Sequence, residues 1–189
     1  MIGSGERVVR ACELAIRLHA LQVRKATTIP YISHLFAVAA LLHDAVEDQG
    51  GKPTLKLIGA QFGPRVAAIV EGCSDSVTAY GEAKAPWRQR KERYLAHLAS
   101  LVRDTAQVED GLGVSILRVS VADKLHNLRS IVADYRACGD QVWQRFTGGQ
   151  SGTLWYYQAL VEVYQQGARS RWLPELERLL GELEATSRP

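Results

Sequence analysis

The sequence predicts an all-α fold, and three observations lead to this prediction. Apolar residues recur at helical spacing in one segment after another. Glycine and proline residues separate these segments, as at Gly50-Gly51 and Gly63-Pro64. The alternating pattern of a half-buried strand holds nowhere for long. With 189 residues the chain is long enough for one compact domain, and we expect residues 1–189 to form a single domain.

The N-terminal half contains four expected helices. A loop at 25–30 follows the first helix, because the residue before Pro30 is disfavoured in the helical region. Ser33 is a possible N-cap of the second helix, which Gly50-Gly51 would end. Pro64 after a glycine is typical of the first turn of a new helix. The expected helices cover 5–22, about 33–48, 55–62 and 64–72.

Polar or glycine-bearing segments divide the C-terminal half, and we expect loops at 73–85, 107–113 and 148–152. Pro86 opens a long basic amphipathic helix, and Cys138-Gly139 ends another. The expected helices cover 86–106, 114–137, 140–146, 154–166 and 172–184.

Composition excludes several classes of protein. Hydrophobic residues make up 47% and charged residues 23%, which is typical of a soluble globular protein. The longest apolar run, 35–42, is far too short to span a membrane, and the N-terminus carries no signal-type segment. A net charge of +3 is too small to indicate DNA or RNA binding. The three scattered cysteines indicate reduced thiols and therefore a cytoplasmic protein.

The stretch Ser33–Gly50, SHLFAVAALLHDAVEDQG, contains two imidazoles and three carboxylates. An adjacent histidine and aspartate, His43 and Asp44, suit a divalent cation such as Mn²⁺, Fe²⁺ or Zn²⁺. Glu47 lies four residues after His43, and Asp48 lies four after Asp44, so each pair shares a helix face. The pattern predicts a metal site with two carboxylates one turn away, where a base would be needed.

A second candidate stretch is VSVADKLHNLR, in which Asp123 stands among apolar residues. Taken alone, Asp123 is better interpreted as an ion-pair partner of Lys124 or Arg129 than as a metal ligand. Together with His34, His43 and Asp44, however, it completes a set of two imidazoles and two carboxylates that would suit a catalytic metal.

Other charged and aromatic residues permit both a structural and a functional interpretation. Arg24 and Lys25 could be solvated charges at a helix end or a phosphate-binding pair. For Arg88, Arg90, Lys91 and Arg93 we favour a solvated helix face over a phosphate site. For Trp155, Tyr156 and Tyr157 we favour the core over a base-stacking surface.

The order of these motifs resembles a known family. The chain is similar to the HD-domain metal-dependent phosphohydrolases in the order of its motifs, H…HD…D, with HDAVED and ADKLHNLR. More narrowly, the chain resembles the small RelA/SpoT-type guanosine tetraphosphate (ppGpp) hydrolases, such as the metazoan SpoT homologues. This resemblance lies in the segments HALQVRKATTIPYISH and LWYYQAL. The similarity covers roughly 13–166 and implies an HD-domain helical bundle.

The resemblance also implies residue roles. His34, His43, Asp44 and Asp123 match the metal ligands, with Mn²⁺ the usual metal. Glu47 and Asp48 match the acidic pair that orients or activates water. Arg24, Lys25 and Asn127 match residues that contact the nucleotide.

One departure from the family pattern concerns the first two ligands. The relatives have a longer connection there, whereas His34 and His43 are nine residues apart with no glycine, proline or asparagine between them. In one straight helix, nine residues turn about 900° and rise about 13–14 Å, so the imidazoles would point to opposite faces.

Three hypotheses follow from the short connection. The helix could break and rebuild the site within one chain. Two helices could have fused, so that a domain-swapped homodimer supplies His34 from one subunit to the other. The metal site could also be incomplete.

We therefore expect a (p)ppGpp 3′-pyrophosphohydrolase-like enzyme. A nucleoside monophosphate phosphatase, or a catalytically degenerate dimeric binding or regulatory protein, remains the alternative.

Overall fold

The computed structural model describes residues 42, 44–76, 78, 83–105, 111–167 and 170–186. All of them belong to Ala39–Pro189, the second of two units into which the chain divides. These residues form helices and no strand, which confirms the predicted all-α fold. Within the same stretches, no helix is long and apolar enough to cross a membrane. The expected helix 5–22 and most of the expected helix 33–48 lie outside the described residues, so the single domain over 1–189 stays a prediction.

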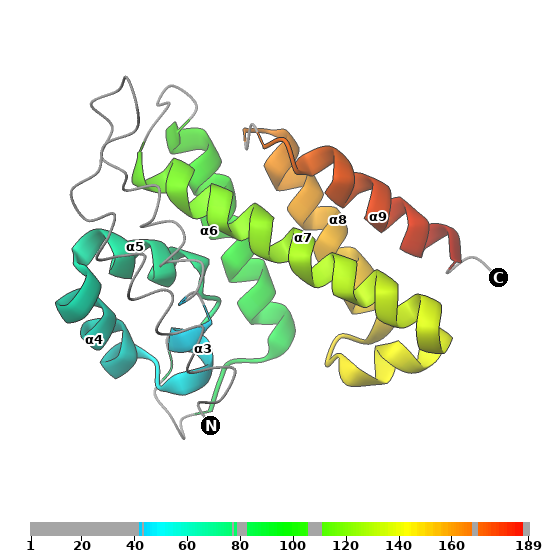
Figure 1. Ribbon diagram of the computed structural model, residues 1–189, viewed down its shortest axis with the longest axis horizontal. Helices are drawn as coiled ribbons and strands as arrows, with labels where there is room; N and C mark the ends of the chain where they lie inside the picture. Colours follow the sequence, from blue (N-terminus) through cyan, green and yellow to red (C-terminus); the bar gives the residue numbers. More distant parts are fainter. Residues whose placement is uncertain are drawn as a thin grey trace, which may run out of the picture. The chain divides into compact units, whose positions relative to one another are not determined.

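The helices follow one another along the chain (Figure 1). Five of the α-helices match the expected segments to within a few residues. In chain order, the elements are α3 (Ala45–Gln49), α4 (Lys52–Phe62), α5 (Pro64–Cys73), α6 (Trp87–Thr105), α7 (Leu112–Cys138), the 3₁₀-helix η1 (Gly139–Arg145), α8 (Gly149–Gln165) and α9 (Leu173–Thr186).

Helix α3 covers the last part of the expected helix 33–48; Leu42 is also helical, and residues 33–41 and 43 lie outside the described part. Asp44 occupies the N-cap position of α3 and lies in a turn, so the predicted helix does not pass unbroken through Asp44. Aspartate is a weak helix former, which is consistent with the turn, although its side chain makes no capping hydrogen bond here. The break follows both histidines, so it leaves the segment between His34 and His43 untested.

The expected glycine-rich loop at 148–152 is wrong, because α8 already begins at Gly149. Gly149 has a φ of +57°, which glycine adopts at little cost. A Cβ atom at Gly148 would lie 2.7 Å from the Trp87 ring, and one at Gly152 would lie 3.3 Å from it. These glycines therefore let the start of α8 approach Trp87 closely, rather than making a flexible loop.

Helix α7 is the centre of the described unit, because it contacts α5, α6, η1 and α9 (Figure 1). Near its N-terminus, the Sγ of Cys73 on α5 lies 3.8 Å from the Ile116 carbonyl oxygen. Near its C-terminus, Arg136 donates to Glu182 on α9 at 2.8 Å. Helix α8 contacts α6, η1 and α9, which closes the bundle.

The core joins α6, α7, η1, α8 and α9 through side chains that are almost wholly withdrawn from water. Leu98, Leu128, Leu160 and Leu176 are each fully buried. A hydroxyl chain crosses this core: Ser120 lies 2.8 Å from the Tyr94 hydroxyl and 2.6 Å from the Tyr164 hydroxyl. Burying these three hydroxyls is tolerated because each has a hydrogen-bond partner.

Candidate active site

Asp123 lies on the central helix α7, and residues of the same helix contact its carboxylate. Its side chain is only 10% exposed. The ammonium of Lys124 lies 2.5 Å from Oδ2, and the amide of Asn127 donates to Oδ1 at 2.9 Å. The sequence predicted an ion pair with Lys124 or Arg129; Lys124 makes it, and Arg129 pairs with Glu175 instead. Asp123 and Asn127 share a helix face, as residues four apart must.

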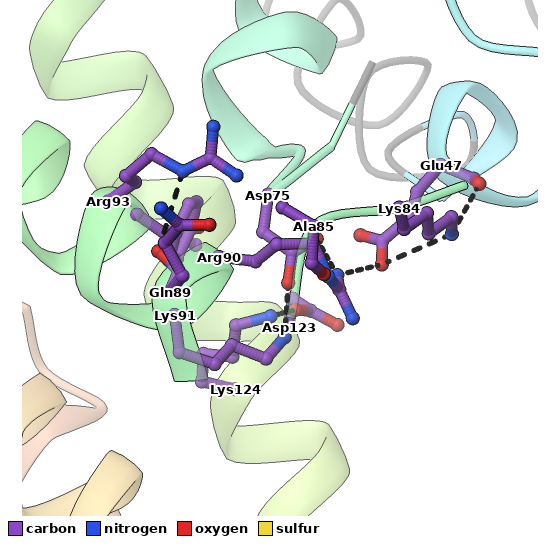
Figure 2. Close-up of polar contacts among 12 residues, drawn as sticks. Glu47, Asp75, Lys84, Ala85, Gln89, Arg90, Lys91, Arg93, Asp123 and Lys124 are labelled. Carbon is purple, nitrogen blue, oxygen red and sulfur yellow. Dashed lines mark hydrogen bonds and ion pairs between the residues drawn. The ribbon is translucent and has the colours of Figure 1, made fainter. Parts of the chain in front are cut away.

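Glu47 lies on α3, and two cations contact it: Lys84 from the segment before α6 and Arg90 from α6 itself. The Lys84 ammonium donates to its carbonyl oxygen at 2.8 Å and lies 3.7 Å from Oε1. Arg90 donates from Nη1 to Oε1 at 3.3 Å (Figure 2). Burial, and then the negative charge of Asp75, raise the pKa of Glu47 above its ordinary value, although Lys91 and Lys84 oppose the shift. A carboxylate with a raised pKa is better suited to accept a proton near neutral pH.

Asp75 connects Glu47 to the basic helix α6, and sequence reasoning placed it in a loop with no role. Its side chain is 3% exposed and is bound by Arg90 and by Lys91, whose Nζ lies 2.5 Å from Oδ2 (Figure 2). Burial alone would raise the pKa of Asp75, but Lys91 and Arg90 outweigh burial and hold that pKa below its ordinary value. Asp75 is therefore a buried anion between two cations.

The expectation of a solvated face on α6 is wrong for two of its four basic residues. Arg90 and Lys91 have side chains 13% and 17% exposed, because they turn toward Asp75. Arg88 and Arg93 are exposed, as expected. One sequence signal was available: Trp87, Lys91, Tyr94 and Leu98 recur at helical spacing on the core-facing side of α6, and Arg90 borders that side.

A cavity of about 340 Å³ lies beside these residues. From α7 it is lined by Asn127, Ser130 and Asp134, which follow Asp123 along one helix face. Three cations also line it, Lys91, Lys124 and Arg145. Of these, Arg145 pairs with Asp134 at 2.8 Å.

Aromatic side chains form another wall of the cavity: Trp87, Phe146, Tyr156 and Tyr157. The expectation that Tyr156 and Tyr157 belong to the core holds, since they are 6% and 5% exposed. Both nevertheless line the cavity, so the core and the cavity share this wall. A space of this size, lined by both cations and aromatic rings, has the chemistry that a nucleotide requires.

The remaining predicted site residues are only partly described. Asp44 is exposed at the start of α3. The backbone of Asp48 lies in α3, but its side chain lies outside the described part, as do His34, His43, Arg24 and Lys25. Among the side chains that the structure does describe, three His, Cys, Asp or Glu residues nowhere gather as a metal-binding group.

Burial raises the pKa of the Cys73 thiol to about 12, with Lys124 opposing the shift and the negative charges of Asp123 and Asp44 adding to it. Carboxylate oxygens are suitable donors for a divalent cation, so Asp44 and Asp123 stay candidates for the expected ligand set.

Comparison with known proteins adds a family and several relatives. A model described as HD domain matches residues 11–153. A "Probable GTP pyrophosphokinase" of Mycobacterium leprae is 33% identical over 141 residues, which cover 66% of this chain and 16% of that protein.

Two further relatives carry a different name. A "Probable guanosine-3′,5′-bis(diphosphate) 3′-pyrophosphohydrolase" of Synechocystis is 30% identical over 141 residues, 67% of this chain and 17% of that protein. A protein of Haemophilus influenzae, "Guanosine-3′,5′-bis(diphosphate) 3′-pyrophosphohydrolase", is 27% identical over 113 residues, 60% of this chain and 15% of that protein. The chain thus spans less than a fifth of the length of the curated relatives it matches.

Proposed function

The chain belongs to the HD-domain family, and on this premise we propose that it is a metal-dependent phosphohydrolase that cleaves a phosphoester or pyrophosphate bond of a nucleotide. The observation that carries the proposal is the face of α7, where Asp123 precedes Asn127 at a cavity lined by Lys91, Lys124 and Arg145. A carboxylate that could bind a metal thus lies on α7, and cations that could bind phosphate come from α6, α7 and η1. Cationic groups offset the charge of phosphate, and Arg can bind it through two hydrogen bonds.

The proposed substrate is a guanosine tetraphosphate-type nucleotide, (p)ppGpp, cleaved at its 3′-pyrophosphate. Support comes from the resemblance of the motifs and from the printed names of the Synechocystis and Haemophilus influenzae relatives. The cavity is large enough to hold part of such a molecule, with the base against the aromatic wall and the phosphates toward the cations.

Each predicted residue has a role in this proposal. His34, His43, Asp44 and Asp123 hold the divalent metal, preferably Mn²⁺, with Fe²⁺ or Zn²⁺ as alternatives. The metal, when bound, supplies Lewis acidity and lowers the pKa of water. Glu47, with its raised pKa, accepts a proton from the attacking water together with Asp48. Arg24, Lys25 and Asn127 hold the nucleotide.

The test is hydrolysis of guanosine tetraphosphate in the presence of Mn²⁺, with the products separated by anion-exchange chromatography. We expect pyrophosphate and GDP, and we expect Asp44→Ala to abolish turnover. Asp104→Ala is the matched control, because Asp104 is an exposed carboxylate at the end of α6. Release of phosphate from nucleoside monophosphates alone would favour the HD-type monophosphatase.

The nine-residue spacing of His34 and His43 favours a second candidate, a catalytically degenerate dimeric protein that binds a nucleotide or regulates a partner. The two candidates differ in metal content and in mass. About one metal ion per chain in a homodimer would support the proposed domain-swapped site with His34 donated between subunits. A dimer that Mn²⁺ cannot load, even at high concentration, would contradict the enzyme and support the degenerate protein.

A further inference from the structure

Two side-chain polar atoms in the described residues are buried without a hydrogen-bond partner, the indole nitrogen of Trp143 and the hydroxyl of Tyr156. Such an atom costs stability, because it has left water without gaining a partner. Trp143 packs against Tyr135 and Phe146 and does not line the cavity. Tyr156 does line it, so of these two residues Tyr156 is the one that a ligand in the cavity could contact.

The ring of Tyr156 is fixed before any ligand arrives. Its centroid lies 6.4 Å from that of Trp87, 6.3 Å from that of Trp155 and 5.9 Å from that of Tyr157. The Lys91 ammonium lies over its face, 5.0 Å from the centroid. Side chains held by aromatic packing keep their rotamer, so the hydroxyl position is set in advance.

The charges around this hydroxyl decide what it can bind. Burial raises the pKa of Tyr156 to about 12, with Lys124 opposing the shift and the carboxylates of Asp75, Asp123 and Glu47 adding to it. The hydroxyl is therefore protonated at neutral pH and can donate a hydrogen bond. It lies among the same groups that form the candidate active site.

We propose that the Tyr156 hydroxyl donates a hydrogen bond to a phosphoryl oxygen of the bound nucleotide and so acts as a substrate-binding residue. This inference rests on the proposed function, because that function supplies the phosphoryl ligand. The hydroxyl adds a neutral donor next to the cations Lys91 and Lys124, whose charges are already committed to Asp75 and Asp123. A phosphoryl oxygen accepts several hydrogen bonds at once, so it can use both kinds of donor.

The test compares Tyr156→Phe with Tyr164→Phe, two substitutions on α8 that each remove a single buried hydroxyl. GDP and guanosine tetraphosphate are the probes, with affinity measured by isothermal titration calorimetry and the melting temperature measured without ligand. We expect Tyr156→Phe to weaken the affinity about ten-fold or more and to leave the melting temperature unchanged or raised. Tyr164→Phe should show the opposite pattern, because the Tyr164 hydroxyl bonds to Ser120 at 2.6 Å and serves the core.

The outcomes separate this inference from the proposed function. Equal affinity of Tyr156→Phe and the wild type for both probes would overturn the inference and leave the function standing. Wild-type protein that binds the probes without hydrolysing guanosine tetraphosphate would overturn the function, while the ratio of affinities still decides the role of Tyr156. Wild-type protein that binds neither probe would overturn the inference together with its premise.

Discussion

Asp75 and Asp123 are two acids that the fold withdraws from water in different ways. Asp75 is 3% exposed and is neutralised by two cations from the adjacent helix, Arg90 and Lys91. Asp123 is 10% exposed, and Lys124, the cation that pairs with it, is the next residue of its own helix. Asn127, one turn later on that helix, donates a hydrogen bond to it and is neutral.

The difference between the partners of the two acids indicates a different role for each acid. Removing Asp75 would take away the anion that Arg90 and Lys91 share, and Lys91 would lose this ion pair while Arg90 keeps Glu47. The interactions of Asp123 with Lys124 and Asn127 form within one helix and do not depend on a second helix. On this comparison we expect Asp75 to be a structural residue that supports Glu47, whereas the role of Asp123 as a metal ligand stays a proposal. The predictions below test the comparison, starting with the largest expected effect.

Asp75→Ala should cause the largest loss of stability. It leaves Arg90 and Lys91 near each other with no shared anion, and breaking a buried pair in this way costs about 3–5 kcal/mol. Urea unfolding followed by circular dichroism measures the loss. Asp104→Ala, at an exposed acid, is the control. A loss of less than about 1 kcal/mol for Asp75→Ala would mean that the two cations need no anion.

Mn²⁺ should stabilise the wild type and should fail to stabilise Asp123→Asn. A ligand present at a hundred times its Kd adds about 2.7 kcal/mol to the free energy of unfolding, and this gain should be largely lost when a neutral amide replaces the anionic carboxylate that binds the metal. Differential scanning fluorimetry with and without Mn²⁺ measures the shift. Asp75→Asn should keep the shift, although it melts at a lower temperature. A normal Mn²⁺ shift in Asp123→Asn would exclude Asp123 as a ligand.

The acid dependence of stability should depend on Asp75. Because the pKa of Asp75 is lowered in the folded state, the unfolded state binds more protons at this residue. Its contribution is therefore present above the ordinary aspartate pKa and is lost as the pH falls through and below that range. Glu47, with a raised pKa, acts in the opposite direction.

The measurement is urea unfolding between neutral and acidic pH for Glu47→Gln and for Glu47→Gln with Asp75→Asn. Using the Glu47→Gln background removes the opposing contribution, so the two proteins differ only at Asp75. We expect the free energy of unfolding to fall less steeply toward acid in the double variant. Parallel curves would show that Asp75 does not titrate differently on folding.

The smallest effect should come from Arg88→Ala, and it sharpens the contrast within α6. Arg88 pairs with Glu92 at 2.7 Å, but the two side chains are 53% and 54% exposed. Exposed pairs of this kind contribute less than about 1 kcal/mol. Arg90→Ala should cost more, about 1–3 kcal/mol, because it removes a donor from buried Asp75. Urea unfolding of both variants measures the two losses of stability. Equal losses would refute the distinction between the two arginines.

Much of the fold could be predicted from the sequence because it depends on local signals. Apolar periodicity located α6, α7 and α9, and Gly139 ended α7 within one residue of the expected position. Proline at the first turn located the start of α5. These signals act within a few residues, where helix geometry is set by neighbouring side chains.

Part of the candidate site could also be predicted from the sequence, because its residues belong to short motifs. The motif ADKLHNLR placed Asp123 beside Lys124 on one helix, and the predicted ion pair with Lys124 is present. The hydrogen bond from Asn127 to Asp123 was not predicted. The metal-binding roles of His34, His43, Asp44 and Asp123 stay predictions. The proposed roles of Arg24, Lys25 and Asp48 also stay predictions.

What the sequence by itself determined is therefore the class of fold, most helix limits and the residues of the short motifs. Only the tertiary structure decided that Asp75 pairs with Arg90 and Lys91, 15 and 16 residues away across a polar segment. It also decided that Gly148 and Gly152 make room for Trp87, and that Tyr156 lines a cavity with an unpartnered hydroxyl. The physical reason is that burial and ion pairing are properties of side chains from different helices, and no local pattern records which helices meet.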